Sequence, residues 1–182
     1  MGASETVGRP SVPLATVPDE LKRRLAELGA PPSVSDAHIY RALANHPSIL
    51  EGWIELAWRL RQDAKTPRRL RELMIVRGAQ IADCEYELRH HEAMALANGV
   101  SESELLDLAG WRDSRSFSPP ERAALAFMEA MVGGKVPDSI LATLAEHFGP
   151  GERVELTVTA GLYSMVPKVI DAFRLPLEED DA

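Results

Sequence analysis

Apolar residues recur at every third or fourth position along most of this chain, and this spacing constrains the fold more than any other feature. Leu50, Trp53 and Ala57 show it clearly, because they fall on one face of a helix with about 3.6 residues per turn. No segment shows the sustained alternation of polar and apolar residues that is typical of strands. The sequence therefore predicts an all-α protein with about eight to ten helices.

Several helix boundaries are marked by residues that favour a start or a stop. Gly99 follows one apolar stripe and suits a left-handed C-terminal cap. Two later starts have the residues of a capping box, which are Ser101 with Glu104 and Ser118 with Glu121. "VPDSI" opens a further helix, and "GPGERVEL" opens a last one that is expected to run towards Pro167.

Length and composition fit one domain with two unstructured ends. A chain of 182 residues that is 45% hydrophobic can bury a sizeable core. Residues 1–17 are rich in Pro, Gly, Ser and Thr and lack periodicity, so we expect a flexible arm there. Residues 18–175 form the expected helical domain, and residues 176–182 form an acidic tail.

The charge and the apolar runs restrict the partners of the protein. A net charge of −8 argues against a nucleic-acid-binding surface, which needs clustered cationic side chains. No apolar run approaches the roughly 20 residues that a membrane helix requires, and the N-terminus has no signal-peptide pattern. We therefore expect a cytoplasmic protein that acts on a small molecule. One cysteine allows no internal disulfide.

The segment "IADCEYELRHHEAM", residues 81–94, gathers the reactive side chains of the chain. Asp83 is the expected N-cap of this helix, which places Cys84 in the first turn, where the helix dipole favours a thiolate. Cys84, Glu87 and His91 follow at helical spacing on one apolar face. Because burying an ionisable group without a partner costs several kcal/mol, these side chains must be paired or used.

The preceding helix adds a second acid to this face. Glu72 aligns with Ile75 and Val76 on a stripe that points inwards. Apolar surroundings raise the pKa of a carboxyl group, which suits proton transfer near neutral pH. The sequence therefore predicts that Glu72, Cys84, Glu87 and His91 meet between two neighbouring helices.

Three further residues are candidates for substrate binding. Tyr86 and His90 lie one turn apart on a flanking face, where they either line a pocket or belong to the surface. Arg77 is the candidate to attract an anionic substrate. It comes from a basic stretch of which most members are expected on a solvated face, namely Arg59, Arg61, Lys65, Arg68, Arg69, Arg71 and Arg77. A purely structural network of Arg77 with Glu72, Glu87 and His91 is the alternative interpretation.

Metal and cofactor motifs are weak in this sequence. Two carboxylates and one histidine can together bind iron, and the sequence offers Glu72, Glu87 and His91. We consider such an iron site a lesser alternative. No phosphate-binding glycine loop, serine nucleophile motif or zinc spacing is present. We expect neither a metal nor a cofactor.

These residues resemble the carboxymuconolactone decarboxylase and alkylhydroperoxidase D superfamily over most of residues 45–175. The peroxidase branch has a Glu, eleven intervening residues, Cys-x-x-Cys and a His four residues later. Glu72, Cys84 and His91 match this pattern, but Glu87 stands where the second cysteine is expected. The Glu87 and His91 pair is therefore more similar to the decarboxylase branch, which lacks the dithiol.

The resemblance implies a helical bundle of the alkylhydroperoxidase D type, and it leaves three hypotheses for the function. The first is a cofactor-independent lyase in which His91 transfers a proton, Glu87 and Glu72 assist, and Cys84 shapes the pocket. The second is a peroxidase that uses Cys84 alone and an external thiol. The third is a non-catalytic helical protein. The resemblance also implies a homo-oligomer of two or three subunits or a multiple of these.

Overall fold

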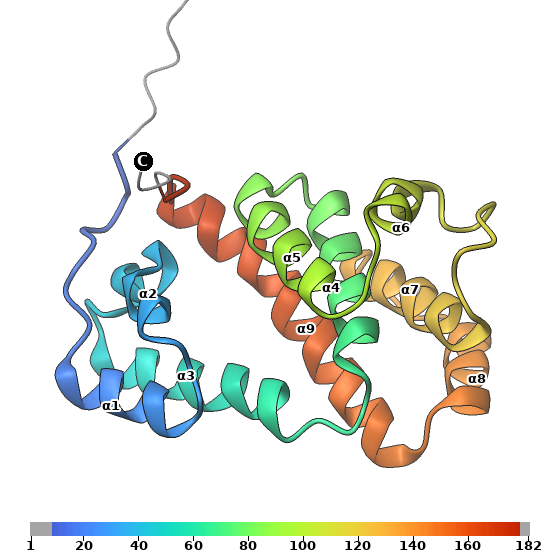
Figure 1. The fold of residues 1–182 in the computed structure, drawn as a ribbon, viewed down its shortest axis with the longest axis horizontal. Coiled ribbons are helices and arrows are strands. Elements are labelled where there is room, and N and C mark those ends of the chain that lie inside the picture. The colour runs from blue at the N-terminus through green and yellow to red at the C-terminus, as the bar shows by residue number, and fades with distance from the viewer. Residues whose placement is uncertain (1–8, 179–182) are drawn as a thin grey trace, which may run out of the picture. The chain divides into compact units, whose positions relative to one another are not determined.

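The structure is a computed structural model that describes residues 9–178, and all the regular secondary structure in this part of the chain is helical (Figure 1). It contains nine α-helices and two 3₁₀ helices and no strand, which confirms the predicted all-α class. No helix within residues 9–178 combines the length and the apolar composition needed to cross a membrane. The elements are α1 (Asp19–Glu27), η1 (Pro32–Asp36), α2 (His38–Leu43), α3 (Pro47–Gln62), α4 (Arg68–Ile81), α5 (Glu85–Ala97), α6 (Glu102–Asp107), η2 (Leu108–Gly110), α7 (Pro119–Val132), α8 (Asp138–His147) and α9 (Pro150–Phe173).

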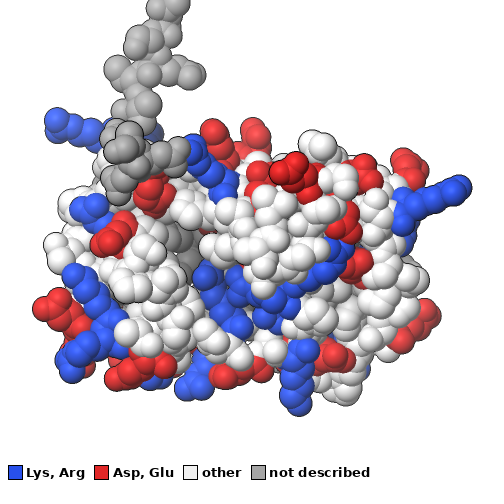
Figure 2. All heavy atoms as spheres, viewed as in Figure 1, with Lys and Arg blue, Asp and Glu red and all other residues white. Residues whose placement is uncertain are grey.

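The chain divides into two compact units, which are described separately. Residues 1–62 and 168–182 belong to the first unit, and residues 63–167 form the second. The second unit holds α4 to α8 and the part of α9 up to Pro167. It contains all the residues of the predicted cluster. Acidic and basic side chains are interspersed on the face seen in Figure 2.

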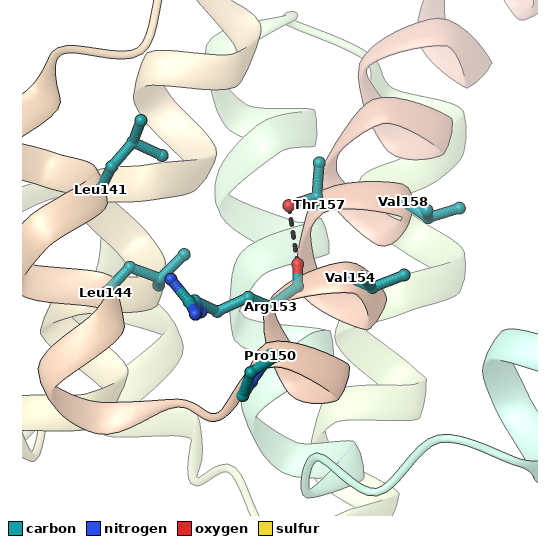
Figure 3. A pocket seen from close by; sticks show the side chains of 7 residues that line it. All are labelled: Leu141, Leu144, Pro150, Arg153, Val154, Thr157 and Val158. Carbon is teal, nitrogen blue, oxygen red and sulfur yellow. Dashed lines mark hydrogen bonds between the residues drawn. The ribbon is translucent and has the colours of Figure 1, made fainter.

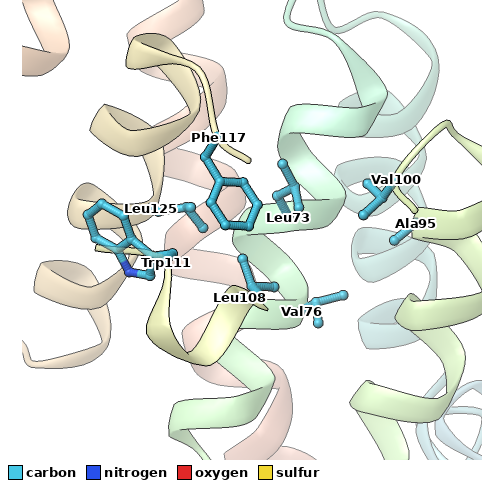
Figure 4. Packing of buried hydrophobic residues seen from close by; sticks show 8 residues of the cluster. All are labelled: Leu73, Val76, Ala95, Val100, Leu108, Trp111, Phe117 and Leu125. Carbon is cyan, nitrogen blue, oxygen red and sulfur yellow. The ribbon is translucent and has the colours of Figure 1, made fainter. Parts of the chain in front are cut away.

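Helix α4 is the central helix of the second unit and packs against both α5 and α7. Its apolar side chains contribute to a buried cluster with residues of α5, η2, α7 and the loops between them (Figure 4). The members are Leu73, Val76, Ala95, Val100, Leu108, Trp111, Phe117 and Leu125. Burial of a Leu or Phe side chain contributes about 1.5–3 kcal/mol. This packing fixes α4 and α5, the two helices that carry the candidate site.

The expected helix boundaries are present. Gly99 has φ +88° and ends α5 in the left-handed conformation. Capping boxes open α6 and α7, at Ser101 with Glu104 and at Ser118 with Glu121. Helix α9 differs from expectation because it passes through Pro167 and ends at Phe173. A proline inside a helix removes one backbone hydrogen-bond donor. It bends the helix without ending it when the residues on both sides of the proline stay packed.

Arg69 of α4 links the two capping boxes. Its guanidinium lies 2.8 Å from Glu121 Oε1 and donates a 3.1 Å hydrogen bond to Glu104 Oε2. It also donates to the carbonyl oxygen of Gly99. A residue that the sequence placed on a solvated face therefore joins the starts of α6 and α7 to α4.

The carboxylate of Glu104 makes part of the stability dependent on pH. The hydrogen bond from Arg69 lowers the pKa of Glu104 from 4.5 to about 2, while burial acts in the opposite direction and hydrogen bonds from Ser101 assist. Because the folded pKa is the lower one, this stabilisation is complete above pH 4.5 and is lost as the pH falls towards 2.

Glutamine still fits a capping box. We expect Glu104→Gln to lower the free energy of unfolding by about 1–2 kcal/mol near neutral pH, and by less in acid.

Urea unfolding of both proteins at several pH values measures this difference. Glu102→Gln is the matched control, because Glu102 is an exposed residue of the same helix. A deficit for Glu104→Gln that stays constant between neutral and acidic pH contradicts the assignment.

In the first unit, the described part of the predicted arm follows the surface of that unit. Ser11 N donates to Phe173 O at 2.8 Å, Asn45 Nδ2 to Pro13 O at 2.6 Å, and Ala15 N to Arg41 O at 3.0 Å. Residues 9–17 thus form a strap on their own chain, and residues 1–8 lie outside the described part. In the predicted tail, Glu178 Oε1 accepts a 2.6 Å hydrogen bond from His38 N, and residues 179–182 are not described.

Candidate functional site

A tight turn joins α4 to α5 and determines where the first reactive side chain lies. Asp83 adopts φ +49°, Asp83 N donates to Gln80 O at 3.3 Å, and Cys84 N donates to Ala79 O at 3.1 Å. This is the Schellman pattern, with an Asp at the position that usually holds Gly. Asp83 is therefore not the N-cap that the sequence suggested, because it closes α4, and Cys84 is the N-cap of α5.

Three of the four predicted cluster residues are in close contact. His91 Nδ1 lies 2.7 Å from Glu72 Oε2, and His91 Nε2 lies 3.6 Å from Glu87 Oε2. The exposed fractions are 0% for Glu72, 5% for Glu87 and 3% for His91. Helix α4 supplies Glu72, and α5 supplies the other two at i and i+4. The imidazole ring therefore lies between two carboxylates, away from solvent.

The cation that pairs with Glu72 is Arg68, one turn earlier on α4. Arg68 Nε donates to Glu72 Oε1 at 2.5 Å, and Arg68 Nη2 also contacts this oxygen. The sequence suggested Arg77 for this place, which is wrong. An Arg four residues before a Glu is a recognisable helical pair, so the signal was present in the sequence.

This arrangement determines how the imidazole is protonated. Arg68 stabilises Glu72 as a carboxylate, and a carboxylate can only accept hydrogen bonds. His91 Nδ1 must then carry the proton in the 2.7 Å contact. The second nitrogen, Nε2, is left to exchange a proton on the side of Glu87. Histidines that act in catalysis or bind metals are commonly oriented by a second residue in this way.

An aromatic ring from α9 completes the surroundings of the histidine. The Tyr163 ring meets the His91 ring edge to face, with 4.9 Å between centroids and an interplanar angle of 83°. Edge-to-face contacts of this kind stabilise by about 0.5–1.5 kcal/mol. No local pattern in the sequence connects Tyr163 with the cluster, so sequence analysis missed it.

Cys84 lies at the start of α5, one turn before Glu87, and is 9% exposed. Its backbone carbonyl accepts the first hydrogen bond of the helix from Leu88 N at 3.0 Å. The backbone donors at a helix N-terminus favour a thiolate there.

The three predicted substrate-binding residues make contacts with other groups. The rings of Tyr86 and His90 stack with 4.5 Å between centroids, and His90 Nδ1 lies 2.7 Å from Tyr86 O. Arg77 lies 2.7 Å from Glu129 Oε1, which also accepts a 2.9 Å hydrogen bond from Trp111 Nε1. Burial raises the pKa of Glu129, but hydrogen bonds from Arg112, Trp111 and Arg77 outweigh it and leave the pKa lower than usual. Arg77 therefore links α4 to α7.

The two carboxylates of the cluster approach opposite edges of the imidazole. Glu72 faces Nδ1 and Glu87 faces Nε2, so their oxygens do not converge on one point. Within the part of the chain that the structure describes, no group of three His, Cys, Asp or Glu side chains is placed to hold a metal ion. The predicted iron-type arrangement is therefore not formed by these three residues.

Two open pockets lie elsewhere in the second unit. One, of about 330 Å³, is lined mainly by apolar residues of α8 and α9, including Leu141, Leu144 and Val154 (Figure 3). The other, of about 400 Å³, has Trp111 and His147 in its lining. Neither is lined by a residue of the His91 cluster.

Comparisons with known proteins identify the family and support the fold. The model of the carboxymuconolactone decarboxylase family matches residues 47–130. The uncharacterized protein YnjA of Escherichia coli (strain K12) is 30% identical over 133 residues, which are 72% of this chain and 70% of YnjA.

Solved structures show the same helical arrangement. An uncharacterized peroxidase-related protein of Ralstonia eutropha JMP134, with an alkylhydroperoxidase AhpD core, matches with a TM-score of 0.75 and 18% identity over 97% of this chain and 95% of its own. A cysteine-to-alanine variant of the debrominase Bmp8, in complex with 2,3,4-tribromopyrrole, matches with a TM-score of 0.76 and 13% identity over 94% and 95% of the two chains. At these identities the likeness concerns the fold. The chain thus belongs to the carboxymuconolactone decarboxylase family and has the helical fold of the alkylhydroperoxidase D-like proteins.

Proposed function

We propose that this protein is a cofactor-independent enzyme of the decarboxylase type, acting on a small organic acid or lactone whose carbanion is delocalised. The observation that supports this proposal is the line of groups that runs from the half-buried Arg68 through the buried Glu72 and His91 to the buried Glu87. Such a line orients one imidazole nitrogen and leaves the other for proton transfer.

In the proposed reaction the chain supplies one proton to the substrate. Loss of CO₂ leaves the bonding electron pair on the substrate carbon, where it is delocalised as an enolate. His91 donates the proton of Nε2 to this carbon and regains one from Glu87 or from water. Glu72 stabilises the imidazolium before the transfer and holds the Nδ1 proton of the neutral ring after it. General acid–base assistance of this kind contributes about 10²–10⁴ in rate.

A second candidate function rests on the position of Cys84. Its place at the first turn of α5 favours a thiolate, which can attack a hydroperoxide and release an alcohol or water. The cysteine becomes a sulfenic acid, and an external thiol must reduce it. Two thiols then form one disulfide per turnover.

Replacing Cys84 with Ala separates the two candidates. In the decarboxylase proposal the variant keeps its turnover, because the proton path runs through His91 and Glu87. In the peroxidase alternative it loses all peroxide reduction. The measurement follows CO₂ loss and deuterium incorporation by NMR in D₂O, with a panel of β-keto acids, unsaturated acids and carboxylated lactones. Hydroperoxide consumption with dithiothreitol is measured in parallel. Loss of decarboxylation in Cys84→Ala contradicts the first proposal.

A further inference from the structure

Arg71 of α4 is a buried arginine without a carboxylate partner. Its exposed fraction is 4%. Its Nη1 donates to the carbonyl oxygen of Thr66 and, at 3.1 Å, to Thr66 Oγ1, both of them neutral oxygens. Among residues 9–178 no salt bridge involves Arg71, and no hydrogen bond involves its Nε or Nη2.

The other arginines of the same helix are all paired. Arg68 contacts Glu72, Arg69 lies 2.8 Å from Glu121, and Arg77 lies 2.7 Å from Glu129. Arginine is rarely buried without a partner, because removing its charge from water is strongly unfavourable. Arg71 therefore makes no direct ion pair with the residues that the structure describes, although the charges of Glu155 and Glu72 act on it from a distance.

The nearest acidic side chain on α9 is already engaged. Glu155 accepts hydrogen bonds from Lys65 N at 2.8 Å, from Thr66 N at 2.9 Å and from Thr66 Oγ1 at 3.0 Å. These bonds hold Thr66, which in turn holds Arg71 Nη1. Glu155 thus positions Arg71 through Thr66 and does not neutralise it directly.

The remaining donors of Arg71 are Nε and Nη2. Neither is among the described polar atoms that are fully buried without a partner, although the side chain as a whole is 4% exposed. Nε and one Nη form the side of a guanidinium that binds a carboxylate through two parallel hydrogen bonds. The electrostatics agree, because burial and the nearby charge of Arg68 lower the pKa of Arg71, against smaller effects of Glu155, Glu72 and Tyr163.

We propose that Arg71 binds the carboxylate of a small organic acid through Nε and Nη2. This inference rests on the proposed function, since it identifies how an acidic substrate is held beside His91. Arg71 directly precedes Glu72 on α4, and Glu72 Oε2 lies 2.7 Å from His91 Nδ1, so neighbouring positions of one helix connect the two places. The ligand's carboxylate supplies the direct ion pair that the described residues do not make with Arg71.

Direct binding tests this site without depending on turnover. The probes are succinate and benzoate, with succinamide and benzamide as neutral counterparts, titrated by ligand-observed NMR and by thermal shift at low chloride. We expect at least one acid to bind and to raise the melting temperature, while its amide does neither. Arg71→Met should weaken the acid by about tenfold or more, and Arg71→Lys should weaken it by less.

Two control variants keep the outcomes distinct. Arg115→Met makes the same charge change at an exposed position and should bind as the wild type does. His91→Gln should also bind the acid, so a failure of the catalytic proposal does not remove the binding result. Arg71→Met should fold at least as stably as the wild type, because it removes an unpaired charge. The assignment is overturned if Arg71→Met binds the acid as tightly as the wild type does, if Arg115→Met loses as much affinity as Arg71→Met, or if the wild type binds neither acid.

Discussion

Replacing His91 with Gln is expected to lower kcat by about 10²–10⁴-fold while the protein stays folded. The side-chain amide of Gln can still donate to Glu72 where Nδ1 does in the wild type. It has no nitrogen that gains and loses a proton near neutral pH, so the transfer step fails. The loss should appear in kcat more than in KM, because the interaction that is removed belongs to the transition state.

The matched control is His46→Gln, at an exposed histidine that precedes α3. Activity on the substrate found in the panel should be unchanged in this variant, and the far-ultraviolet circular dichroism of both variants should equal that of the wild type. Undiminished kcat in His91→Gln removes His91 from the mechanism.

The second large effect concerns stability and follows from the ion pair of Arg68 with Glu72. We expect Glu72→Met to lower the free energy of unfolding by about 3–5 kcal/mol, because it leaves the positive charge of Arg68 and the Nδ1–H of His91 without their acceptor. Arg68→Met should also be destabilising, because Glu72 has no exposed surface. The double variant should recover most of the loss, since apolar pairs replace buried ion pairs at little cost.

Urea unfolding of the wild type, the two single variants and the double variant measures the coupling between the side chains. If the double variant loses as much free energy of unfolding as the two single variants together, the pairing is contradicted.

A variant with Glu72, Glu87 and His91 all made apolar tests the non-catalytic interpretation. It should remain folded but lose turnover, whereas retained turnover would exclude the cluster from catalysis.

Much of the fold could be read from the sequence, because its signals are local. Gly99 and the two capping boxes are short-range features, and the structure has them where they were expected. The contact of Glu72 with His91 was also predictable, since an inward-facing acid and an inward-facing histidine on neighbouring helices must find partners. Glu87 followed from its spacing of one turn to His91.

The errors arise where two local signals compete or where the partner is distant in sequence. Asp83 suits both an N-cap and a left-handed turn, and in the structure it forms the left-handed turn that ends α4. Pro167 suggested a helix end, but α9 continues through it. Tyr163 and Arg71 gain their roles from tertiary packing, which no pattern within one helix contains. Arg71 in particular looked like one member of a solvated basic stretch.

The ¹⁵N NMR shifts of the His91 ring test the central claim most directly. The claim is that Glu72 holds the proton on Nδ1 and leaves Nε2 as the nitrogen that exchanges. With histidine-labelled protein, and with His91→Gln to assign the signals, the neutral ring should carry its proton on Nδ1, hydrogen-bonded to Glu72. Nε2 should then be the unprotonated nitrogen of that ring. A neutral ring that carries its proton on Nε2, with Nδ1 unprotonated beside Glu72, would contradict the claim.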